Sequence, residues 1–273
     1  MIEFVKAHAC GNDFLVVDEA LAQGRHADMA RLLCSRNFSV GADGVEFLDR
    51  RADGSLFLRL FNADGSEAEL SGNGTRCVAA WLAYSEGLKE TVLGTQGGAK
   101  TCRVIECDDE HFLIETSMGV PKVFEKVVVV EGVGEVAGAV VDVGNPHFVI
   151  FVEDDTFAAH GLTWEALGER ICTHSDFPHG TNVEFVRVIA ADTVAFRIYE
   201  RGVGPTQSSG TGTSASSAAS IVLRGCAREL EASSLGGSQR VVWPEGEQLM
   251  LTGPAEIVCQ GKVSLQSMGS FAS

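Results

Sequence analysis

The sequence predicts an α/β (α+β) protein of two pseudo-symmetric domains that arose by internal duplication, each a curved sheet around one central helix. Residues 71–75 (Ser-Gly-Asn-Gly-Thr) and 209–213 (Ser-Gly-Thr-Gly-Thr) repeat one Gly-rich pattern at an offset of 138 residues. The same offset relates Val-Glu-Phe at 45–47 to Val-Glu-Phe at 183–185. A constant offset over so long a stretch indicates a duplicated half, and 273 residues suffice for two domains.

The first half has the pattern of short strands with one principal helix. Apolar and alternating runs bounded by turn residues predict the strands, and helical spacing after the first Gly-rich loop predicts the helix. In order, the expected elements are strands at 1–6 and 14–18, a helix at 26–36, a strand at 55–61, a polar loop at 62–75, a helix from 75 to about 87, and strands at 99–107, 111–116 and 122–130.

The second half repeats this plan. Six serines between 208 and 220 could indicate a flexible linker, but the match to the first Gly-rich loop favours a helix. Because Ala, Ser and Gly have small side chains, strands can pack closely around such a helix, and we expect both principal helices to be buried. The expected elements are strands at 140–143 and 148–152, a helix at 164–172, strands at 183–188 and 194–199, and a helix that ends at 224. The expected domains are 1–118 and 119–259, with a strand at about 260–273 completing the first.

The composition excludes several classes of partner. Phosphate polyanions and anionic membranes are bound by clustered Lys and Arg, whereas this chain has a net charge of −16 and no basic cluster. We therefore expect neither nucleic acid nor a membrane as partner. The first residues lack the layout of a signal peptide, so a soluble cytoplasmic protein is expected. The eight cysteines form no Cys-x-x-Cys unit, which predicts neither disulfides nor a metal site.

The two Gly-rich loops are candidate anion sites. A helix N-terminus carries unpaired N–H groups and a partial positive charge, and Gly lets a ligand approach closely. Two such ends facing one another would hold a single carboxylate and place Ser71 and Ser209 on opposite sides of the carbon attached to it. This arrangement suits an enzyme that removes a proton from one face and returns one to the other, because the N–H groups stabilise the charge that develops.

Two other interpretations of the loops remain open. Residues 210–215 match the dinucleotide fingerprint G-x-G-x-x-A, but they follow a polar segment rather than a strand, and the twin loop ends in Cys77. The glycines could also serve only close helix–sheet packing. Polar residues beside the loops favour a site over packing alone: Asn62, Asp64, Glu67, Glu200 and Arg201.

Six runs of the chain match the motifs of a known enzyme family, in the family's order. They are His-Ala-Cys-Gly-Asn-Asp-Phe at 8–14, Phe-Asn-Ala-Asp-Gly-Ser-Glu-Ala-Glu at 61–69, Gly-Asn-Gly-Thr-Arg-Cys at 72–77, Gly-Asn-Pro-His-Phe at 144–148, Gly-Thr-Asn-Val-Glu-Phe at 180–185 and Glu-Arg-Gly-Val-Gly at 200–204. Through them nearly the whole chain closely resembles the diaminopimelate epimerase family.

The resemblance implies a PLP-independent isomerase without a cofactor. Such an enzyme inverts the α-carbon of LL- or meso-diaminopimelate, or of a similar amino acid, in lysine and peptidoglycan precursor biosynthesis. The resemblance also implies mostly antiparallel sheets and a cytoplasmic homodimer. In the family one cysteine in each domain acts on the α-carbon, one as thiolate base and the other as thiol acid from the opposite side.

In this chain the positions that resemble the two family cysteines are Ser71 and Ser209. A thiol has a pKa of about 8.5, which a helix N-terminus lowers further, whereas a serine hydroxyl needs a neighbouring base. The resemblance assigns the tuning of this pair to His147 and Glu200. The structural alternatives are a packed histidine at 147 and a salt bridge of Glu200 with Arg201 or Arg197.

The resemblance also assigns substrate contacts. The backbones of Gly72, Asn73, Gly210 and Thr211 would bind the carboxylate at the reacting centre. Gly44, where some family members have Gln, and Gln207-Ser208, in place of an apolar pair, leave the substrate's side chain open. The contacts to the distal amino acid end fall on Asn12, Asn62, Asn145, Asn182, Glu200 and Arg201.

The sequence leaves three functions open. The first is an epimerase or racemase in which polarised serines replace the thiols. The second is a relative that performs a lyase or isomerase reaction with less need for matched thiols. The third is a binder without activity, either a natural pseudoenzyme or a chain whose cysteines were replaced. Cys10 is an alternative base, although an ordinary buried cysteine in a turn is preferred.

Overall fold

The computed structural model describes residues 1–264, which form two compact units. Of the described residues, unit 1 comprises Met1–Glu115 and 254–264, and unit 2 comprises Thr116–Gly253. Residues 265–273, most of the strand predicted at 260–273, lie outside the described residues. None of the helices in the described part is both long and apolar enough to cross a membrane.

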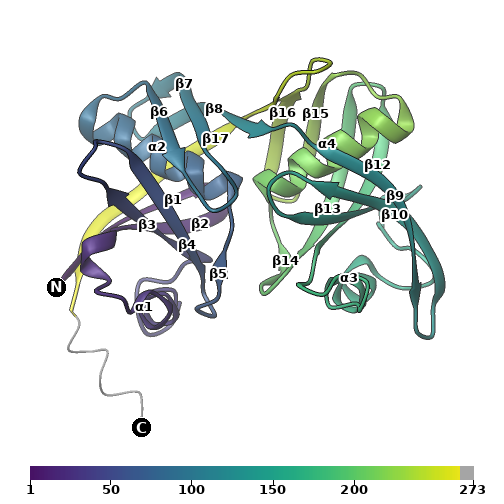
Figure 1. Cartoon of the computed structure of the whole chain (residues 1–273), viewed down its shortest axis with the longest axis horizontal. Helices are drawn as coiled ribbons and strands as arrows, with labels where there is room; N and C mark the ends of the chain where they lie inside the picture. Colours follow the sequence, from purple (N-terminus) through teal and green to yellow (C-terminus); the bar gives the residue numbers. More distant parts are fainter. Residues whose placement is uncertain (265–273) are drawn as a thin grey trace, which may run out of the picture. The chain divides into compact units, whose positions relative to one another are not determined.

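In unit 1 the strands surround the helix α2 (Gly72–Glu86), as the purple and blue part of Figure 1 shows. Antiparallel pairs join β1 to β2, β3 to β4, β4 to β5 and β6 to β7, whereas β2 with β3 and β4 with β6 are parallel. The other elements are β1 (Ile2–Ala9), β2 (Asn12–Asp18), η1 (Glu19–Leu21), α1 (His26–Leu33), β3 (Gly44–Arg50), β4 (Leu56–Asn62), β5 (Glu67–Ala68), β6 (Glu90–Gly94) and β7 (Lys100–Asp108).

Unit 2 repeats this order around the helix α4 (Gly210–Arg224). Here β11 with β12 and β13 with β15 are parallel, and the pairs β9–β10, β10–β11, β12–β13, β13–β14 and β15–β16 are antiparallel. The other elements are β9 (Lys122–Val130), β10 (Gly134–Asp142), β11 (Pro146–Phe151), α3 (Trp164–Cys172), β12 (Asn182–Ala190), β13 (Thr193–Glu200), β14 (Gly204–Thr206), β15 (Glu229–Ser234) and β16 (Gly237–Val242).

The chain crosses between the units within two strands, β8 (His111–Gly119) and β17 (Leu249–Val263). β17 pairs with β16 near its start and with β1 near its end. The crossing points follow residues 115 and 253, whereas the sequence suggested boundaries after residues 118 and 259. The predicted class, a mixed fold of mostly antiparallel sheets with few helices, is confirmed.

The two central helices are equivalent products of the duplication. Both bounds of α2 and α4 differ by the same 138 residues, and each helix ends at a glycine in the left-handed region, Gly87 (φ 71°) and Gly225 (φ 67°). In α4 every residue from Gly210 to Ile221 is buried. In α2 the residues from Gly72 to Ala80 are buried as well. The predicted burial of both helices is confirmed.

Two predicted helix boundaries are wrong. The first central helix begins at Gly72 rather than near Thr75, because the Ser71 side chain caps it and the first turn is buried. The predicted polar loop at 62–75 therefore contains the first turn of α2, and it also contains β5. The helix predicted at 26–36 ends at Leu33, where the last turn tightens into a Ser35 N–H to Leu32 carbonyl bond.

Candidate active site

Each central helix begins at a serine whose side chain caps it. Ser71 Oγ accepts a hydrogen bond from the Gly74 N–H at 3.0 Å, and Ser209 Oγ accepts one from the Gly212 N–H at 3.2 Å. Both serines have the extended backbone typical of N-cap residues. Capping uses only the oxygen of each hydroxyl, so the hydroxyl hydrogen can still be donated to another group.

The first turns of both helices are suited to hold an anion. N–H groups in the first turn of a helix have no acceptor within the helix, and the helix dipole favours negative charge there. Gly72 and Asn73 occupy this position in α2, and Gly210 and Thr211 occupy it in α4. The four residues predicted to bind a carboxylate through their backbones therefore lie where a helix binds anions, two in each unit.

In unit 2, hydrogen bonds connect Ser209 to a buried acid. Ser209 Oγ lies 3.2 Å from Thr211 Oγ1, which accepts a hydrogen bond from Asn145 Nδ2 at 3.5 Å. Asn145 Oδ1 lies 2.8 Å from His147 Nε2, and His147 Nδ1 lies 2.6 Å from Glu184 Oε1. The side chains of His147 and Glu184 are fully buried. We call this series of five residues the Ser209 chain.

The hydrogen bonds constrain where protons lie in the Ser209 chain. Because an amide oxygen only accepts, His147 Nε2 donates to Asn145 when the amide is oriented as above. Burial raises the pKa of Glu184 even with the imidazole beside it. The 2.6 Å distance between Glu184 Oε1 and His147 Nδ1 is that of a hydrogen bond, which requires one proton between these two atoms. The amide of Asn145 does not relay protons without changing tautomer. The Ser209 chain therefore orients and polarises the Ser209 hydroxyl rather than conducting protons to it.

Glu184 is a residue that the sequence prediction missed. The resemblance assigned the tuning of the serines to His147 and Glu200 and named no role for Glu184, whose carboxyl group contacts His147. The repeated Val-Glu-Phe pattern contained the signal, because it puts an acid between apolar residues of a strand at both 46 and 184. A carboxyl group buried in a strand must be either paired or protonated, which makes the residue a candidate for a functional role.

Glu200 and Arg201 lie at the end of β13 and in the turn that follows. Glu200 Oε1 accepts a hydrogen bond from Thr206 Oγ1 at 2.6 Å. The Arg201 N–H donates to Asn182 Oδ1 at 2.9 Å, and Arg201 Nη1 donates to the His179 carbonyl at 2.9 Å. The structure thus brings Asn182 and Arg201 into direct contact within unit 2, beside the predicted Glu200.

In unit 1, the predicted residues Asn12 and Asn73 are in direct contact. Asn73 Nδ2 donates to Asn12 Oδ1 at 3.1 Å, and Asn12 Nδ2 donates to Asp43 Oδ2 at 2.8 Å. The fully buried Arg76 donates to Asn73 Oδ1 at 2.6 Å. These bonds fix the orientation of both amides, and the side-chain oxygen of each amide already accepts one hydrogen bond.

Asp43 belongs to an ion-paired group at the start of β2. Arg36 Nη2 lies 2.7 Å from a carboxylate oxygen of Asp43 and 2.7 Å from one of Asp13, and Lys6 Nζ lies 2.9 Å from Asp13. Burial alone would raise the pKa of Asp13, but the hydrogen bonds of Arg36 and Lys6 lower it below its ordinary value. Asp13 therefore remains ionised at neutral pH, and its ion pairs fix the start of β2, where Asn12 lies.

The remaining predicted residues of unit 1 are Asn62 and Cys10. Asn62 ends β4, and its Nδ2 donates to Ser66 Oγ at 3.0 Å in the next turn. Cys10 is buried in the turn between β1 and β2, with a left-handed φ of 53°. Cys77, which lies in α2 just after the first Gly-rich loop, is also buried, and burial raises the pKa of its thiol. Buried thiols of this kind are unreactive.

Within residues 1–264 no three His, Cys, Asp or Glu side chains are grouped to hold a metal ion.

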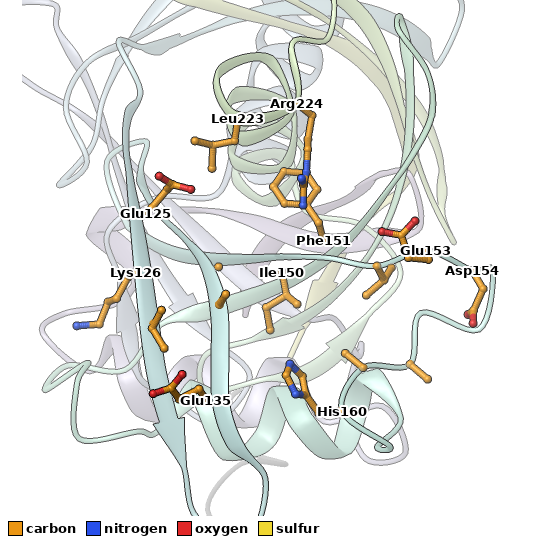
Figure 2. A pocket seen from close by; sticks show the side chains of 16 residues that line it. Glu125, Lys126, Glu135, Ile150, Phe151, Glu153, Asp154, His160, Leu223 and Arg224 are labelled. Carbon is orange, nitrogen blue, oxygen red and sulfur yellow. The ribbon is translucent and has the colours of Figure 1, made fainter.

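A surface pocket of unit 2 lies at the far end of α4 (Figure 2). Leu223 and Arg224, the last residues of α4, line it, and the Arg224 guanidinium lies 4.3 Å from the ring centre of Phe151. The helix has 15 residues, so the pocket is about 20 Å along its axis from Ser209. It is therefore separate from the candidate site. Its acidic lining residues are Glu125, Glu135, Glu153 and Asp154.

Diaminopimelate epimerases of other organisms match the chain over nearly its whole length. The diaminopimelate epimerase of Pelotomaculum thermopropionicum is 35% identical over 280 residues, covering 96% of this chain and 98% of the relative. That of Carboxydothermus hydrogenoformans is 38% identical over 282 residues, covering 97% of this chain and 100% of the relative.

Solved structures share the fold at lower identity. A probable proline racemase from Agrobacterium radiobacter with bound carbonate has a TM-score of 0.77 at 18% identity, covering 100% of this chain and 95% of that one. A hydroxyproline epimerase from Agrobacterium vitis has a TM-score of 0.72 at 20% identity, covering 97% and 91%. The sequence model of the diaminopimelate epimerase family matches residues 4–124 and 139–258. This match and the relatives above establish that the chain belongs to the diaminopimelate epimerase family.

Proposed function

We propose that this protein inverts the α-carbon of LL- or meso-diaminopimelate, or of a similar amino acid, without pyridoxal phosphate or another cofactor. One observation carries the proposal: the duplication supplies two buried helix N-termini, each with a serine at its cap. Diaminopimelate epimerases 35% and 38% identical to the chain support the substrate class. In this function the backbones of Gly72, Asn73, Gly210 and Thr211 bind the carboxylate of the reacting centre.

In this proposal Ser71 and Ser209 act on opposite faces of the α-carbon. Two donors can stabilise an alkoxide at Ser209, the Gly212 N–H and the Thr211 hydroxyl. At Ser71 the corresponding donor is the Gly74 N–H. In one direction the Ser209 alkoxide takes the α-proton, and the Ser71 hydroxyl gives its proton to the opposite face. The two serines thereby exchange protonation states, and the reverse reaction exchanges them back.

The distal end of the substrate requires one cationic and one anionic partner. Arg201 suits a carboxylate, because a guanidinium binds it with two hydrogen bonds, and Glu200 suits an ammonium ion. The amide side chains of Asn12 and Asn145 each retain an N–H beyond those in the bonds described above, so they can also contact a ligand. The four amides proposed for this end are Asn12, Asn62, Asn145 and Asn182.

Incubation with LL-diaminopimelate in heavy water tests the proposed function. We expect deuterium at the α-carbon together with formation of the meso isomer, because an inverting enzyme returns a solvent-derived proton. The double variant Ser71→Ala/Ser209→Ala should lose both signals while it still binds the substrate. If the wild-type protein binds diaminopimelate but neither exchanges nor inverts it, the proposal of epimerase activity is wrong.

A second candidate is a form that binds the substrate but has lost or altered this chemistry. Both serine oxygens already serve as helix caps, which favours a structural role for them. For this candidate we expect stabilisation by diaminopimelate without α-proton exchange. A product whose formula differs from that of diaminopimelate by more than the exchange of hydrogen for deuterium would instead indicate a lyase. Loss of exchange on thiol alkylation would indicate a cysteine as base, as in the Cys10 alternative, rather than a serine.

The cellular setting and assembly are part of the same proposal. An epimerase of this type would act in the cytoplasm on precursors of lysine and peptidoglycan, as a homodimer. Sedimentation at several protein concentrations tests the dimer: a single species of twice the 29.0 kDa chain mass is expected, and a monomer at every concentration would contradict it.

A further inference from the structure

A carboxyl oxygen without a hydrogen-bond partner among residues 1–264 lies against the first turn of α2. Glu46, on β3, is only 1% exposed, and its Oε1 has no hydrogen-bond partner among the described residues. A Cβ atom placed on Gly74 would lie 1.9 Å from this oxygen. The Gly74 N–H donates the capping hydrogen bond to Ser71 Oγ. The Glu46 carboxyl group therefore lies directly beside the proposed anion-binding turn.

The duplication supplies a matched reference for Glu46 in unit 2. Glu184 occupies the equivalent strand position and lies beside Gly212, where a Cβ atom would be 3.2 Å from Glu184 Oε1. Glu184, however, is hydrogen-bonded to His147. His147 pairs with Asn182 in the β11–β12 register. The two units thus place an acid under each helix end but give only the second acid a histidine.

Phe14 explains why Glu46 lacks this histidine. In the β2–β3 register Phe14 pairs with Gly44, the position that corresponds to the pairing of His147 with Asn182. The backbone neighbours of Glu46 itself are the apolar Val16 and Leu60. An ionised carboxylate in such surroundings is strongly unfavourable, so burial raises the pKa of Glu46 to about 8.

Other titratable groups around Glu46 do not replace the missing partner. From α2, Cys77 interacts with Glu46, but burial raises the pKa of this thiol and keeps it neutral. Arg76 directs its guanidinium to Asn73 and to the Pro254 carbonyl. From β2, Asp13 is ion-paired with Lys6 and Arg36. Glu46 therefore enters the neutral pH range as a carboxylic acid.

We propose that the protonation state of Glu46 determines whether the N-terminal turn of α2 can hold a substrate carboxylate. This inference rests on the proposed function, in which that turn binds the reacting centre. With Glu46 neutral, the partial positive charge of the turn is available to the ligand. With Glu46 ionised, a full negative charge lies against the same turn and repels the carboxylate. Glu46 is thus a positioning residue, since it acts through Gly74 and the turn rather than on the reacting atoms.

The affinity for LL-diaminopimelate as a function of pH tests this role. Calorimetric titrations from pH 6.5 to 9.5 would compare the wild-type protein with Glu46→Gln, which stays neutral throughout. We expect the wild-type Kd to weaken by about tenfold or more above pH 8 relative to the variant, through Coulomb repulsion at short range. In kinetics the loss should appear in KM, with kcat changed little. Glu106→Gln, at an exposed position of β7, is the matched control and should behave like the wild type.

The outcomes separate this inference from the proposed function. Binding at pH 6.5 followed by the same alkaline loss in wild type and Glu46→Gln would overturn the role of Glu46 alone. An absence of binding at pH 6.5 in both proteins would overturn the proposed substrate and, with it, this role. If Glu46→Gln does not fold, Glu46→Leu provides a second neutral side chain, and an alkaline loss equal to that of the wild type would again overturn the inference.

Discussion

At the scale of single residues, serine and cysteine differ in how well they cap a helix and in how readily they ionise. A serine is a good helix N-cap but a poor acid or base, whereas a thiol ionises more readily and caps less well. Ser71 and Ser209 both cap their helices through Oγ. In the proposed function, serine at these two positions would thus give less proton-transfer ability and more stability of the two central helices than cysteine.

The double variant Ser71→Cys/Ser209→Cys tests this trade. We expect α-proton exchange of diaminopimelate to become faster, because a thiolate forms more easily at a helix N-terminus. The free energy of unfolding should fall by about 1 kcal/mol for each lost cap. Exchange rates in heavy water and urea denaturation measure the two effects. Exchange no faster than in the wild type would mean that the serines do not limit the reaction.

The charge state of Glu46 should also appear in the stability of the protein. Its pKa in the folded protein, about 8, exceeds the ordinary value of 4.5. Between these values the folded protein holds a proton that the unfolded chain has released, so the free energy of unfolding falls as the pH rises. The slope of this contribution is about 1.4 kcal/mol per pH unit. Glu46→Gln should remove it, which makes the variant more stable relative to the wild type at pH 8 than at pH 5.

Urea denaturation at several pH values between 5 and 8 measures this difference. Glu106→Gln serves again as the control, because its exposed carboxyl group has no burial to relieve. Parallel stability profiles of the wild type and Glu46→Gln across this range would show that Glu46 ionises as an ordinary acid.

The sequence predicted the candidate site only in part at this scale. Ser71, Ser209 and His147 could be named because they lie in recognisable local motifs. The contact between His147 and Glu184 depends on the register in which β11 pairs with β12, and this register is a tertiary property. The same holds for the contact of Asn12 with Asn73, which joins residues 61 positions apart.

At the scale of elements, local propensity misplaced the start of α2. Gly72, Asn73 and Gly74 are poor helix formers, so the sequence favoured a loop up to Thr75. Capping by Ser71 and burial of the first turn override this propensity. The strand β5 has only two residues, too few to give a periodic signal, and it was missed for that reason.

The close contact between α2 and β3 makes Gly74 a sensitive position. In Gly74→Ala the new methyl group would meet Glu46 Oε1 at 1.9 Å, so one element must move. We expect a loss of about 1–3 kcal/mol in the free energy of unfolding, as for other overpacked sites. The double variant Gly74→Ala/Glu46→Ala should recover part of this loss, because it removes the clashing side chain. Denaturation of the three variants gives the coupling energy, and strictly additive losses would contradict the contact.

At the scale of the whole molecule, the duplication was the feature best predicted from sequence. A constant offset survives in the sequence because equivalent residues occupy equivalent positions in both units, and the matching bounds of α2 and α4 bear this out. The crossings between units leave no such signal. They lie inside the continuous strands β8 and β17, where the chain has neither a linker nor a change of composition.

The two halves are equivalent in backbone but not in the groups behind their serines. Ser209 has the Ser209 chain, which ends in the His147–Glu184 pair, whereas Glu46 under Ser71 has no such partner. We therefore expect Ser209→Ala to reduce α-proton exchange more strongly than Ser71→Ala. In Ser71→Ala the better-supported base remains, so one stereoisomer should still exchange its α-proton without being inverted.

Separate incubations of the LL and meso isomers in heavy water measure this asymmetry. Exchange of one isomer without inversion in Ser71→Ala, and its loss in Ser209→Ala, is the expected pattern. Thr211→Val supplies an internal check, because it removes the hydroxyl that links Ser209 to Asn145 and should slow the same exchange, while Thr211→Ser should preserve it. Equal losses in the two serine variants would mean that the Ser209 chain organises the fold of unit 2 and gives neither serine an advantage as base.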